Sequence, residues 1–258
     1  MGRLHLLEIH DQPWCPRSLR DALTDFLQFT INLGGTYDVV VPILRDAIAR
    51  AGATQVVDLC SGAGGPWRRW AHKPRGMAPG FGMAAGFAMP VVLTDKYPNS
   101  LAQSGSLPFH PVPVDATAVP SDLKGFRTLF TSFHHFRPAE ARAILADAVR
   151  QGQGIGVFEI SRRAPREIAV IALTWLAVLG LVPFIRPMRW SRLAWTYLPP
   201  VLPLVGLFDG VVSCLRTYAP RELRDLLRGL DTYDWQIGET RSRWSPLRVT
   251  YLVGVPKR

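Results

Sequence analysis

The stretch 56-VVDLCSGAGGPWRRW-70 joins a short apolar run to an acidic residue, a group of small residues and then a tryptophan. The apolar run predicts a buried strand over residues 55–58, and the glycines after it predict a turn into a helix. Glycines at positions 62, 64 and 65 let the backbone approach a ligand closely, and the N–H groups of the following helix point to the same place. The stretch therefore predicts a ligand-binding turn at the end of a strand.

The tryptophan limits which ligand this turn can hold. In dinucleotide-binding turns a third glycine allows the helix to pack tightly on the strand, and here that position is Trp67. An indole would collide with such packing, so NAD and FAD are disfavoured. A phosphate-binding G-K-[ST] sequence is also missing, because Pro66 follows Gly65. We expect Trp67 to pack in the core and the turn to hold a ligand without a diphosphate.

Strands and helices alternate along most of the chain. Further strands are predicted over residues 90–94, 111–114, 128–133 and 154–160, and two closing strands near 235–239 and 249–255. Amphipathic helices are predicted after Ser18, over 41–48, from Pro138 to Gly152 and from Pro220 to Leu230. A Gly/Ala/Met-rich segment at 76–89 is predicted to be a mobile loop. The order predicts an α/β fold in three layers, with a mostly parallel sheet and an antiparallel last strand.

Three aspartates stand at the ends of predicted strands. Asp58, Asp95 and Asp115 each follow one of the first three strands. A single aspartate at such a place is typically a helix cap or a turn residue. Ligands of parallel sheets bind at the carboxyl ends of the strands, so three acids after successive strands indicate a binding edge.

With these residues identified, the chain resembles the class I, Rossmann-like methyltransferases that depend on S-adenosylmethionine (SAM). The segment 58-DLCSGAGG-65 is similar to their first motif, with Cys60 in place of a more usual glycine. The segment 128-TLFTSFHHF-136 is similar to their fourth-strand motif, which faces the cofactor and the acceptor. The distance from Gly64 to Asp95 is longer than the family's norm, because residues 68–89 intervene.

The resemblance implies SAM as the cofactor and a set of residues around it. It places the first motif near the methionine part, Asp95 at the ribose hydroxyls and Asp115 near the adenine amine. The residues that it implies in cofactor binding are Asp58, Cys60, Gly62, Gly64, Asp95, Asp115, Ala116 and Ser132.

Two histidines follow the predicted fourth strand. His134 and His135 are the candidates for a general base, because histidine titrates near neutral pH and can remove a proton from an acceptor. The alternative is that one or both cap the next helix or bond a backbone carbonyl. If the strand continued through them, they could not both point into one pocket.

Composition narrows the partners and the compartment. The formal net charge is +10, from 30 Lys+Arg against 20 Asp+Glu, which favours an anionic partner or reflects a basic proteome. Cys15, Cys60 and Cys214 lack metal-ligand spacing, so we expect no zinc site and no disulfide framework, and a reducing, cytoplasmic location. The N-terminal residues lack the apolar core of a secretion signal.

One apolar segment falls outside the resemblance. Residues 168–185 carry no charge and would form a helix of roughly 27 Å, short for a ~30 Å hydrocarbon core. The second piece, 193–208, contains Pro199, Pro200 and Pro203, which predict that it forms a poor continuous helix. Because the chain after residue 209 must rejoin the sheet, we expect a re-entrant or interface-lying hairpin that dips into one leaflet. The alternative is a water-soluble lid or a homodimer interface.

Basic and aromatic residues flank the two apolar pieces. Such residues are typical of a headgroup layer, and arginines attract anionic lipid. This set comprises Arg162, Arg163, Arg166, Arg186, Arg189 and Arg192, with Trp175, Trp190, Trp195 and Tyr197.

Three segments and a ranked set of functions follow. Residues 1–52 are expected to be helices that cover the cofactor site, 53–160 and 209–258 the SAM-binding core, and 161–208 the hydrophobic insertion. The first hypothesis is a methyltransferase that acts on a hydrophobic or lipid-like small molecule at the cytoplasmic face of a membrane. The second is a soluble natural-product O-, N- or C-methyltransferase, with the insertion as lid or dimer interface. Nucleic-acid methylation ranks lower because the N/D-P-P-aromatic signature is missing from the fourth strand, so we expect no nucleic acid as partner. A non-catalytic SAM-binding protein is the remaining alternative.

Overall fold

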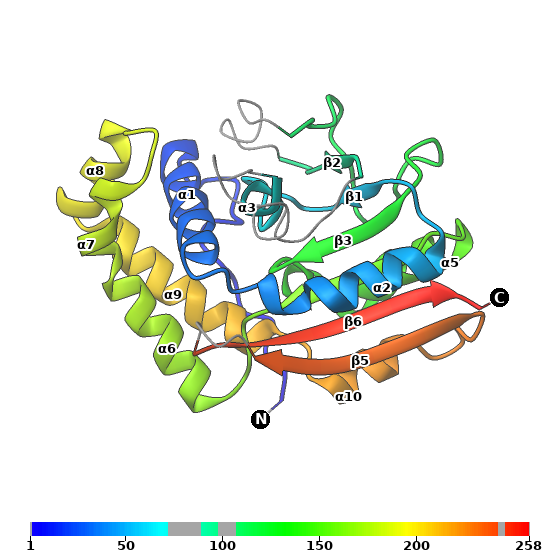
Figure 1. Ribbon diagram of the computed structural model, residues 1–258. Coiled ribbons are helices and arrows are strands. Elements are labelled where there is room, and N and C mark those ends of the chain that lie inside the picture. Colours follow the sequence, from blue (N-terminus) through cyan, green and yellow to red (C-terminus); the bar gives the residue numbers. More distant parts are fainter. Residues whose placement is uncertain (1, 72–88, 98–106, 242–245, 258) are drawn as a thin grey trace.

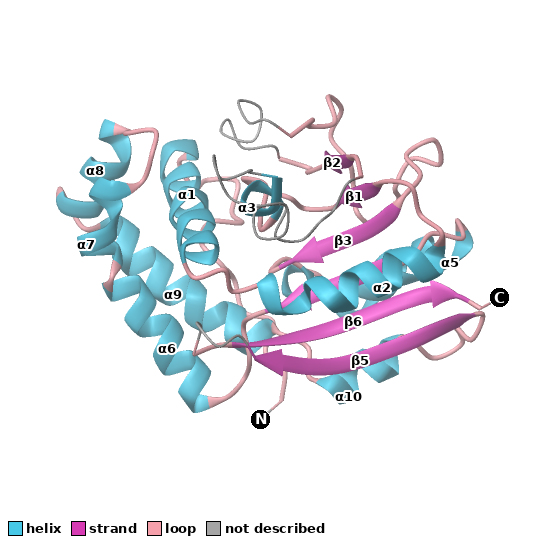
Figure 2. Ribbon diagram, viewed as in Figure 1, coloured by secondary structure: helices cyan, strands magenta, loops and turns pink. Residues whose placement is uncertain are grey.

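The computed structural model describes residues 2–71, 89–97, 107–241 and 246–257. Figures 1 and 2 show one twisted sheet with helices on both faces and a group of helices at one end. In chain order the described elements are α1 (Arg17–Leu33), η1 (Asp38–Val40), α2 (Val41–Ala51), β1 (Val56–Asp58), α3 (Trp67–Ala71), β2 (Val91–Leu93), β3 (Phe126–Phe130), η2 (Phe133–His135), α5 (Pro138–Arg150), β4 (Ile155–Glu159), α6 (Pro165–Leu176), α7 (Val178–Leu181), η3 (Val182–Phe184), α8 (Trp190–Tyr197), α9 (Val201–Arg216), α10 (Pro220–Leu226), β5 (Tyr233–Arg241) and β6 (Arg248–Pro256).

The sheet of the described residues has six strands in the order β2-β1-β3-β4-β6-β5. β1 pairs in parallel with β2 and β3, and β3 pairs in parallel with β4. β6 runs antiparallel to both β4 and β5. Every residue of β1, β3 and β4 is buried, as expected for parallel strands covered on both faces. The predicted three-layer α/β fold with an antiparallel last strand is confirmed.

Apolar residues on the two faces of the sheet hold the layers together. On one face, Leu44 and Ile48 of α2 pack with Phe126 and Phe158. On the other, Ile144 and other residues of α5 pack with α10 and β3. α5 begins at Pro138, and the Arg137 N–H donates to the Glu140 carboxylate at 2.7 Å, which satisfies one of the free donors at the helix start.

Two strand predictions are wrong. Residues 111–114 form no strand, and the chain there makes a single bridge between Leu93 and Phe109, since prolines remove the donors that a ladder needs. Asp115 therefore follows an irregular segment. The fourth strand ends at Phe130 and not at Phe133, because Thr131 adopts a positive φ of 48° and the chain turns into η2. The predicted loop at 76–89 lies almost wholly outside the described residues.

The insertion forms a cap together with α1. Phe26 of α1 packs with Trp175 of α6 at a ring distance of 4.8 Å, and one apolar cluster joins α1 with α6, α7, η3 and α9. Ser18 does not cap α1, and its hydroxyl accepts a hydrogen bond from the Trp195 indole of α8 at 3.0 Å. Figure 1 shows these helices at the left end of the sheet.

The second apolar piece is not one continuous helix, as its prolines predict: α8 ends at Tyr197, α9 begins at Val201, and the two are bent by 79°. α9 is a helix of 16 residues that begins just after Pro200, and Pro203 lies in its first turn, where a missing N–H costs no helical hydrogen bond. α9 continues to Arg216, so the expected boundary at residue 208 falls inside it. Pro165–Phe184 is a 20-residue stretch that is long and apolar enough to cross a membrane, and 22% of its most apolar 18 residues are buried. The bent helices α8 and α9 form a second apolar pair.

Two of the residues expected at a headgroup layer are instead buried. Arg192 is 1% exposed and donates to the Asp25 carboxylate of α1 at 2.6 Å. Trp175 is 4% exposed and packs inside the cap. Arg162 and Arg163 are held in ion pairs with Glu239 and Glu222. Of the set, Trp190 is the most exposed aromatic side chain, at 82%.

Candidate functional site

The turn after β1 has the backbone that its glycines predict. Gly62 has a φ of 53° and Gly64 a φ of 103°, both in the region that favours glycine. Cys60 also has a positive φ of 54°, and this is the position where a glycine is more usual in the resembling motif. Among the described residues, a Cβ on Gly62 would meet Thr24 Cγ2 at 3.6 Å, an ordinary contact, so nothing in this part of the chain crowds the glycine. The turn is an open backbone cradle.

Asp95 ties this turn to the end of β2. Its Oδ2 accepts a hydrogen bond from the Gly62 N–H at 2.8 Å, and its Oδ1 accepts one from the Tyr97 N–H at 2.7 Å. β1 and β2 are neighbours in parallel, so their carboxyl ends meet at one edge of the sheet. The Asp95 carboxylate therefore fixes the floor of the cradle and keeps further lone pairs for a ligand.

Asp58 lies beneath the turn and is 1% exposed. Its Oδ1 accepts a hydrogen bond from the Thr128 hydroxyl of β3 at 2.6 Å. Burial raises the pKa of this carboxyl to about 7, although the hydrogen bonds from Thr128 and Ser61 oppose the shift. Trp67 is buried beside it and packs edge-on against Trp70 at 5.0 Å, so the prediction that this indole belongs to the core is confirmed.

Asp115, Ala116 and Ser132 lie farther along the same edge of the sheet. Lys96 donates to the Asp115 carboxylate at 2.8 Å, and this bond, with those from Thr117, lowers the pKa of Asp115 to about 2. Ala116 is buried. Ser132 is buried, and its Oγ has no hydrogen-bond partner among the described residues. A buried hydroxyl without a partner at a binding edge is a free donor and acceptor for a ligand.

The two histidines take different partners. His134 is 1% exposed, and its Nδ1 lies 2.9 Å from Glu159 Oε2 at the end of β4. His135 Nδ1 lies 3.1 Å from Glu8 Oε2 and 3.0 Å from Asp11 Oδ2. Burial lowers the pKa of His135, but the Glu8 and Asp11 carboxylates outweigh it and raise the pKa to about 10. Because η2 replaces a strand here, both histidines border one cavity; that either acts as a general base stays a prediction.

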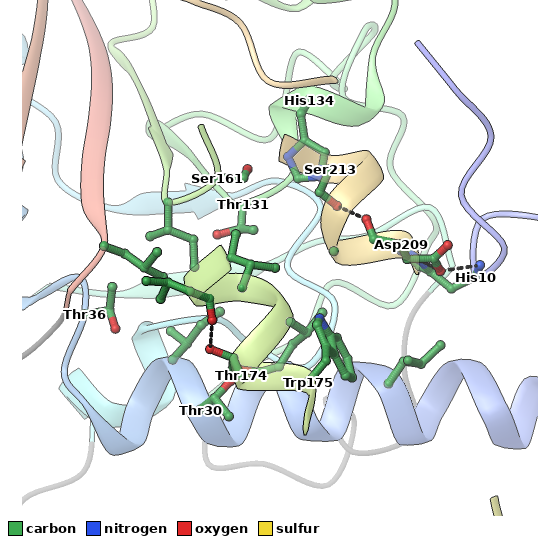
Figure 3. A pocket seen from close by; sticks show the side chains of 18 of the residues that line it. His10, Thr30, Thr36, Thr131, His134, Ser161, Thr174, Trp175, Asp209 and Ser213 are labelled. Carbon is green, nitrogen blue, oxygen red and sulfur yellow. Dashed lines mark hydrogen bonds and ion pairs between the residues drawn. The ribbon is translucent and has the colours of Figure 1, made fainter. Parts of the chain in front are cut away.

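This cavity has a volume of about 250 Å³ and lies between α1, α6, α9 and the ends of β3 and β4. Figure 3 shows Thr30 of α1, Trp175 and Thr174 of α6, and Ser213 and Asp209 of α9 around it. The apolar part of its wall comprises Leu23, Leu27, Ile31, Ile160, Val170, Ile171, Trp175 and Leu247. Of the residues predicted for the site, only the two histidines border this cavity.

α1 separates the cavity from the glycine turn. Gln28 Nε2 donates to the Gly65 carbonyl at 2.6 Å, and Thr24, one turn earlier, faces Gly62. Leu23, Leu27 and Ile31, at the same spacing on another face, line the cavity. The glycine turn and the cavity thus lie against different faces of one helix.

Sequence reasoning missed the polar segment that closes the cavity beside the histidines. Glu8, His10 and Asp11 surround His135, and Asp209 of α9 holds His10. The available signal was 8-EIHD-11, a dense group of ionisable residues in a segment without helical or strand periodicity. Its residues do not have the spacing of a known metal-binding or catalytic motif, and its partner Asp209 is about 200 residues away in the chain.

No protein-family model matches the sequence, and no curated protein matches it. Solved structures do match. The plantazolicin methyltransferase BpumL in complex with SAH has a TM-score of 0.55 and 9% identity, over 96% of this chain and 93% of that chain. The same enzyme with a triazolic desmethylPZN analog and SAH has a TM-score of 0.50 and 8% identity, over 96% and 88%.

The chain has the Rossmann-like methyltransferase fold. In this fold the edge that carries the glycine turn, Asp95 and Ser132 is the edge at which ligands of parallel sheets bind. The glycine turn therefore lies at the ligand-binding edge of this fold, and the cap adds an apolar cavity next to it.

Proposed function

We propose that the protein transfers a methyl group from SAM to a hydrophobic small molecule. The observation that carries this proposal is the pair of compartments on either side of α1, the open glycine turn with Asp95 and the apolar cavity beside His134. The similar fold of a methyltransferase in complex with SAH supports the choice of cofactor.

The residues at the cradle fit a SAM molecule. Among the described residues nothing crowds Gly62, so a ligand can lie against its backbone, and the unpartnered Ser132 hydroxyl offers it a hydrogen bond. Asp95 keeps acceptor capacity for ribose hydroxyls, and Asp58, Cys60, Gly64, Asp115 and Ala116 complete the predicted set. When bound, SAM supplies an activated methyl group on a sulfonium. The task of this chain is then to align an acceptor and exclude water, which the buried edge and the cap do.

The cavity favours an apolar acceptor. Most of the exposed area of its wall is aliphatic and indole. The polar groups on the wall are those of Thr30, Thr36, Thr131, Ser161, Thr174 and Ser213, the three histidines His10, His134 and His135, and Asp209. Pockets of this kind bind apolar molecules and use single polar groups to orient them. We propose that the acceptor is an apolar ring system or acyl chain with one polar atom at its reacting end.

We also propose that the acceptor is taken from a membrane surface. Large apolar side chains are exposed at the end of the insertion, namely Leu173, Leu176, Leu179, Phe184, Met188, Trp190 and Leu198. Arg186, in the same loop, is exposed and offers a positive charge to anionic headgroups. An exposed apolar group of this size is typical of a membrane or protein contact.

The cofactor proposal is tested by calorimetry with SAM and SAH. We expect the wild type to bind both, and Asp95→Ala to bind at least about tenfold more weakly, because it loses the carboxylate that fixes Gly62 and faces the ribose. Asp122→Ala, an exposed carboxylate on another loop, is the matched control and should bind normally. Uptake of NAD with no uptake of SAM or SAH would refute the proposal.

The acceptor is sought by mass spectrometry. A membrane-lipid and metabolite extract is incubated with the protein and SAM labelled in its methyl group, and products that gain one labelled methyl are identified. We expect the labelled product to partition into organic solvent. A labelled product that is polar would contradict the hydrophobic acceptor but not methyl transfer.

Membrane association is tested by flotation with vesicles. We expect the wild type to float with vesicles that contain anionic lipid, and the triple variant Phe184→Glu, Trp190→Glu, Leu198→Glu to stay at the bottom. Val112→Glu, which places a charge at an exposed apolar position outside the cap, should float as the wild type does. A wild type that stays at the bottom and is a dimer by light scattering would instead support the soluble enzyme with the insertion as dimer interface.

A further inference from the structure

Four side chains that can bind a metal ion converge beside the cavity. Glu8, His10 and Asp11 come from the segment before α1, and His135 comes from η2. One ligand atom from each can be chosen so that all four lie within 4.8 Å of one another. Glu8 is fully buried, whereas the side chains of His10, Asp11 and His135 are 22%, 35% and 24% exposed, so an ion can reach the cluster.

The separations between these atoms match those around a single ion. His135 Nδ1 lies 3.1 Å from Glu8 Oε2 and 3.0 Å from Asp11 Oδ2. His10 Nε2 lies 3.5 Å from Asp11 Oδ1 and 3.9 Å from Glu8 Oε2. With metal–ligand bonds of about 2.1 Å, neighbouring ligands lie about 3.0 Å apart in an octahedron and about 3.4 Å apart in a tetrahedron. Small side-chain movements are enough to bring all four atoms to an ion.

α9 supplies the outer contacts that orient two of the ligands. Asp209 Oδ2 lies 2.8 Å from His10 Nδ1, which leaves Nε2 directed at the cluster. A carboxylate on the far nitrogen of a metal-binding histidine is a recurrent arrangement in metalloproteins, because it fixes the tautomer and the ring. Asp209 is itself held by the backbone N–H groups of Ile9 and His10, at 2.7 and 3.0 Å.

Glu8 has one satisfied and one unsatisfied oxygen. Its Oε1 accepts a hydrogen bond from the Ser213 hydroxyl at 3.0 Å and lies 3.4 Å from Arg216 Nη1. Its Oε2 is buried and accepts no hydrogen bond from the described residues. A buried carboxylate oxygen without a donor is costly in free energy, and here it points at two imidazoles. This oxygen lies 3.1 Å from His135 Nδ1 and 3.9 Å from His10 Nε2, so it faces the space in which an ion would sit.

The charges around the cluster also leave room for a cation. Three carboxylates, those of Glu8, Asp11 and Asp209, meet one guanidinium, that of Arg216, which lies 3.2 Å from Asp11 Oδ2. Carboxylates outnumber guanidinium groups at the cluster, which favours a cation over an anion there.

We propose that Glu8, His10, Asp11 and His135 bind a divalent transition-metal ion on the wall of the cavity. Two imidazoles with two carboxylates favour Zn²⁺ or a neighbouring first-row ion over Mg²⁺ and Ca²⁺, which prefer all-oxygen sites. The expectation of no zinc site rested on the cysteines, and none of these four ligands is a cysteine.

The place of the ion suggests its use. His10 and His135 both border the cavity, so a coordination position left open by the protein faces the acceptor. An acceptor oxygen or nitrogen bound there would be held in place and would lose its proton more readily. This second step rests on the proposed methyl transfer, whereas metal binding does not.

The binding test uses the tag-free, full-length protein, freed of metal by a chelator, and Zn²⁺ as the probe. We expect one saturable site by calorimetry, at least about tenfold weaker in His10→Ala and weaker also in Asp209→Asn, which removes only the outer carboxylate. His110→Ala, a histidine in a distant loop, is the matched control and should bind as the wild type does. Circular dichroism and thermal unfolding of each variant show whether it is folded.

A spectroscopic measurement on the unchanged protein makes the test independent of the variants. Co²⁺ in place of Zn²⁺ should give visible ligand-field absorption that His10→Ala loses. No saturable Zn²⁺ uptake by the folded wild type would overturn the proposal, as would equal affinity in His10→Ala and the wild type. SAM binding without metal binding would leave the methyltransferase proposal standing and remove this one; metal binding without SAM binding would do the reverse.

Discussion

Asp58 is an ionisable residue in a place that water does not reach. Its carboxyl is 1% exposed, and burial raises its pKa to about 7 in the folded protein, against 3.8 for an ordinary aspartate. The folded state therefore holds the proton more tightly than the unfolded state between these two values. The contribution of Asp58 to the free energy of unfolding is therefore fully present at low pH. It declines as the pH rises from about 4 to about 7 and is lost above the pKa of the folded state.

Replacement of Asp58 by asparagine should remove that decline. The amide of the asparagine still offers an oxygen to the Thr128 hydroxyl but carries no charge at any pH. We expect the free energy of unfolding of the wild type to fall between pH 5 and pH 8 by roughly 2–3 kcal/mol more than that of Asp58→Asn. Urea unfolding at the two pH values measures this difference. Asp122→Asn should keep the wild-type pH dependence, and equal slopes in wild type and Asp58→Asn would contradict the argument.

At the scale of the elements, α6 packs on α9 with a tryptophan of α6 over two glycines of α9. Gly206 and Gly210 are four residues apart, so they lie on one face of α9, and the Trp175 indole of α6 covers them. A Cβ on Gly206 would lie 2.1 Å from Trp175 Cε3, which no ordinary contact allows. The same indole forms part of the cavity wall, so this contact also shapes the cavity.

Gly206→Ala should therefore destabilise the cap. We expect a loss of about 1–3 kcal/mol in the free energy of unfolding, because overpacking outweighs the gain in helix propensity. Gly180→Ala, in α7 and with no heavy atom within 4 Å of the added Cβ, should be neutral or stabilise by up to about 1 kcal/mol. Thermal unfolding of the two variants beside the wild type compares them, and a Gly206→Ala protein as stable as Gly180→Ala would rule this packing out.

At the scale of the whole molecule, a buried ion pair attaches the insertion to the N-terminal helix. Arg192 of α8 and Asp25 of α1 meet at 2.6 Å, with side chains 1% and 0% exposed. Arg192 also donates to the carbonyls of Ile185 and Pro187, at 2.7 and 2.8 Å. Removal of the Arg192 charge leaves the buried Asp25 with the more distant Arg189, whose Nε lies 3.8 Å from Asp25 Oδ2. The loss of the close partner costs more than the pair itself contributes.

Arg192→Met should cost about 3–5 kcal/mol in the free energy of unfolding, and the double variant Asp25→Leu, Arg192→Met should recover much of it. Arg228→Met, which breaks an exposed pair with Asp225, should cost less than about 1 kcal/mol. Urea unfolding followed by tryptophan fluorescence and by circular dichroism gives these values. A double variant that is less stable than Arg192→Met would show that the pair is stabilising in itself.

The sheet could be predicted from local patterns because its strands are short apolar runs with clear ends. The glycine turn was also predictable from local sequence, because a few adjacent glycines are enough to specify a turn with positive φ angles. The strand expected at 111–114 failed because two prolines remove ladder donors, and Asp115 reaches the edge of the sheet from an irregular segment instead.

The rest of the site depends on partners that are far apart in the chain. An arginine such as Arg192 is expected at the surface from its sequence. Only the fold shows that it is buried in an ion pair with Asp25. The group around His135 joins residue 8 to residue 216, and no local pattern predicts such a meeting. The break between α8 and α9 was predictable from Pro199 and Pro200. The length of α9 was not, because Pro203 lies in its first turn, where the missing N–H costs no helical hydrogen bond.

α1 is one rigid rod with a ligand compartment on each side. Any occupant of the glycine turn that moves this rod changes the width of the cavity, and any occupant of the cavity that moves it changes the turn. Thermodynamic reciprocity then requires the two affinities to rise or fall by a common factor. In the proposed function, such a coupling would link the affinities for SAM and for the acceptor through a single helix.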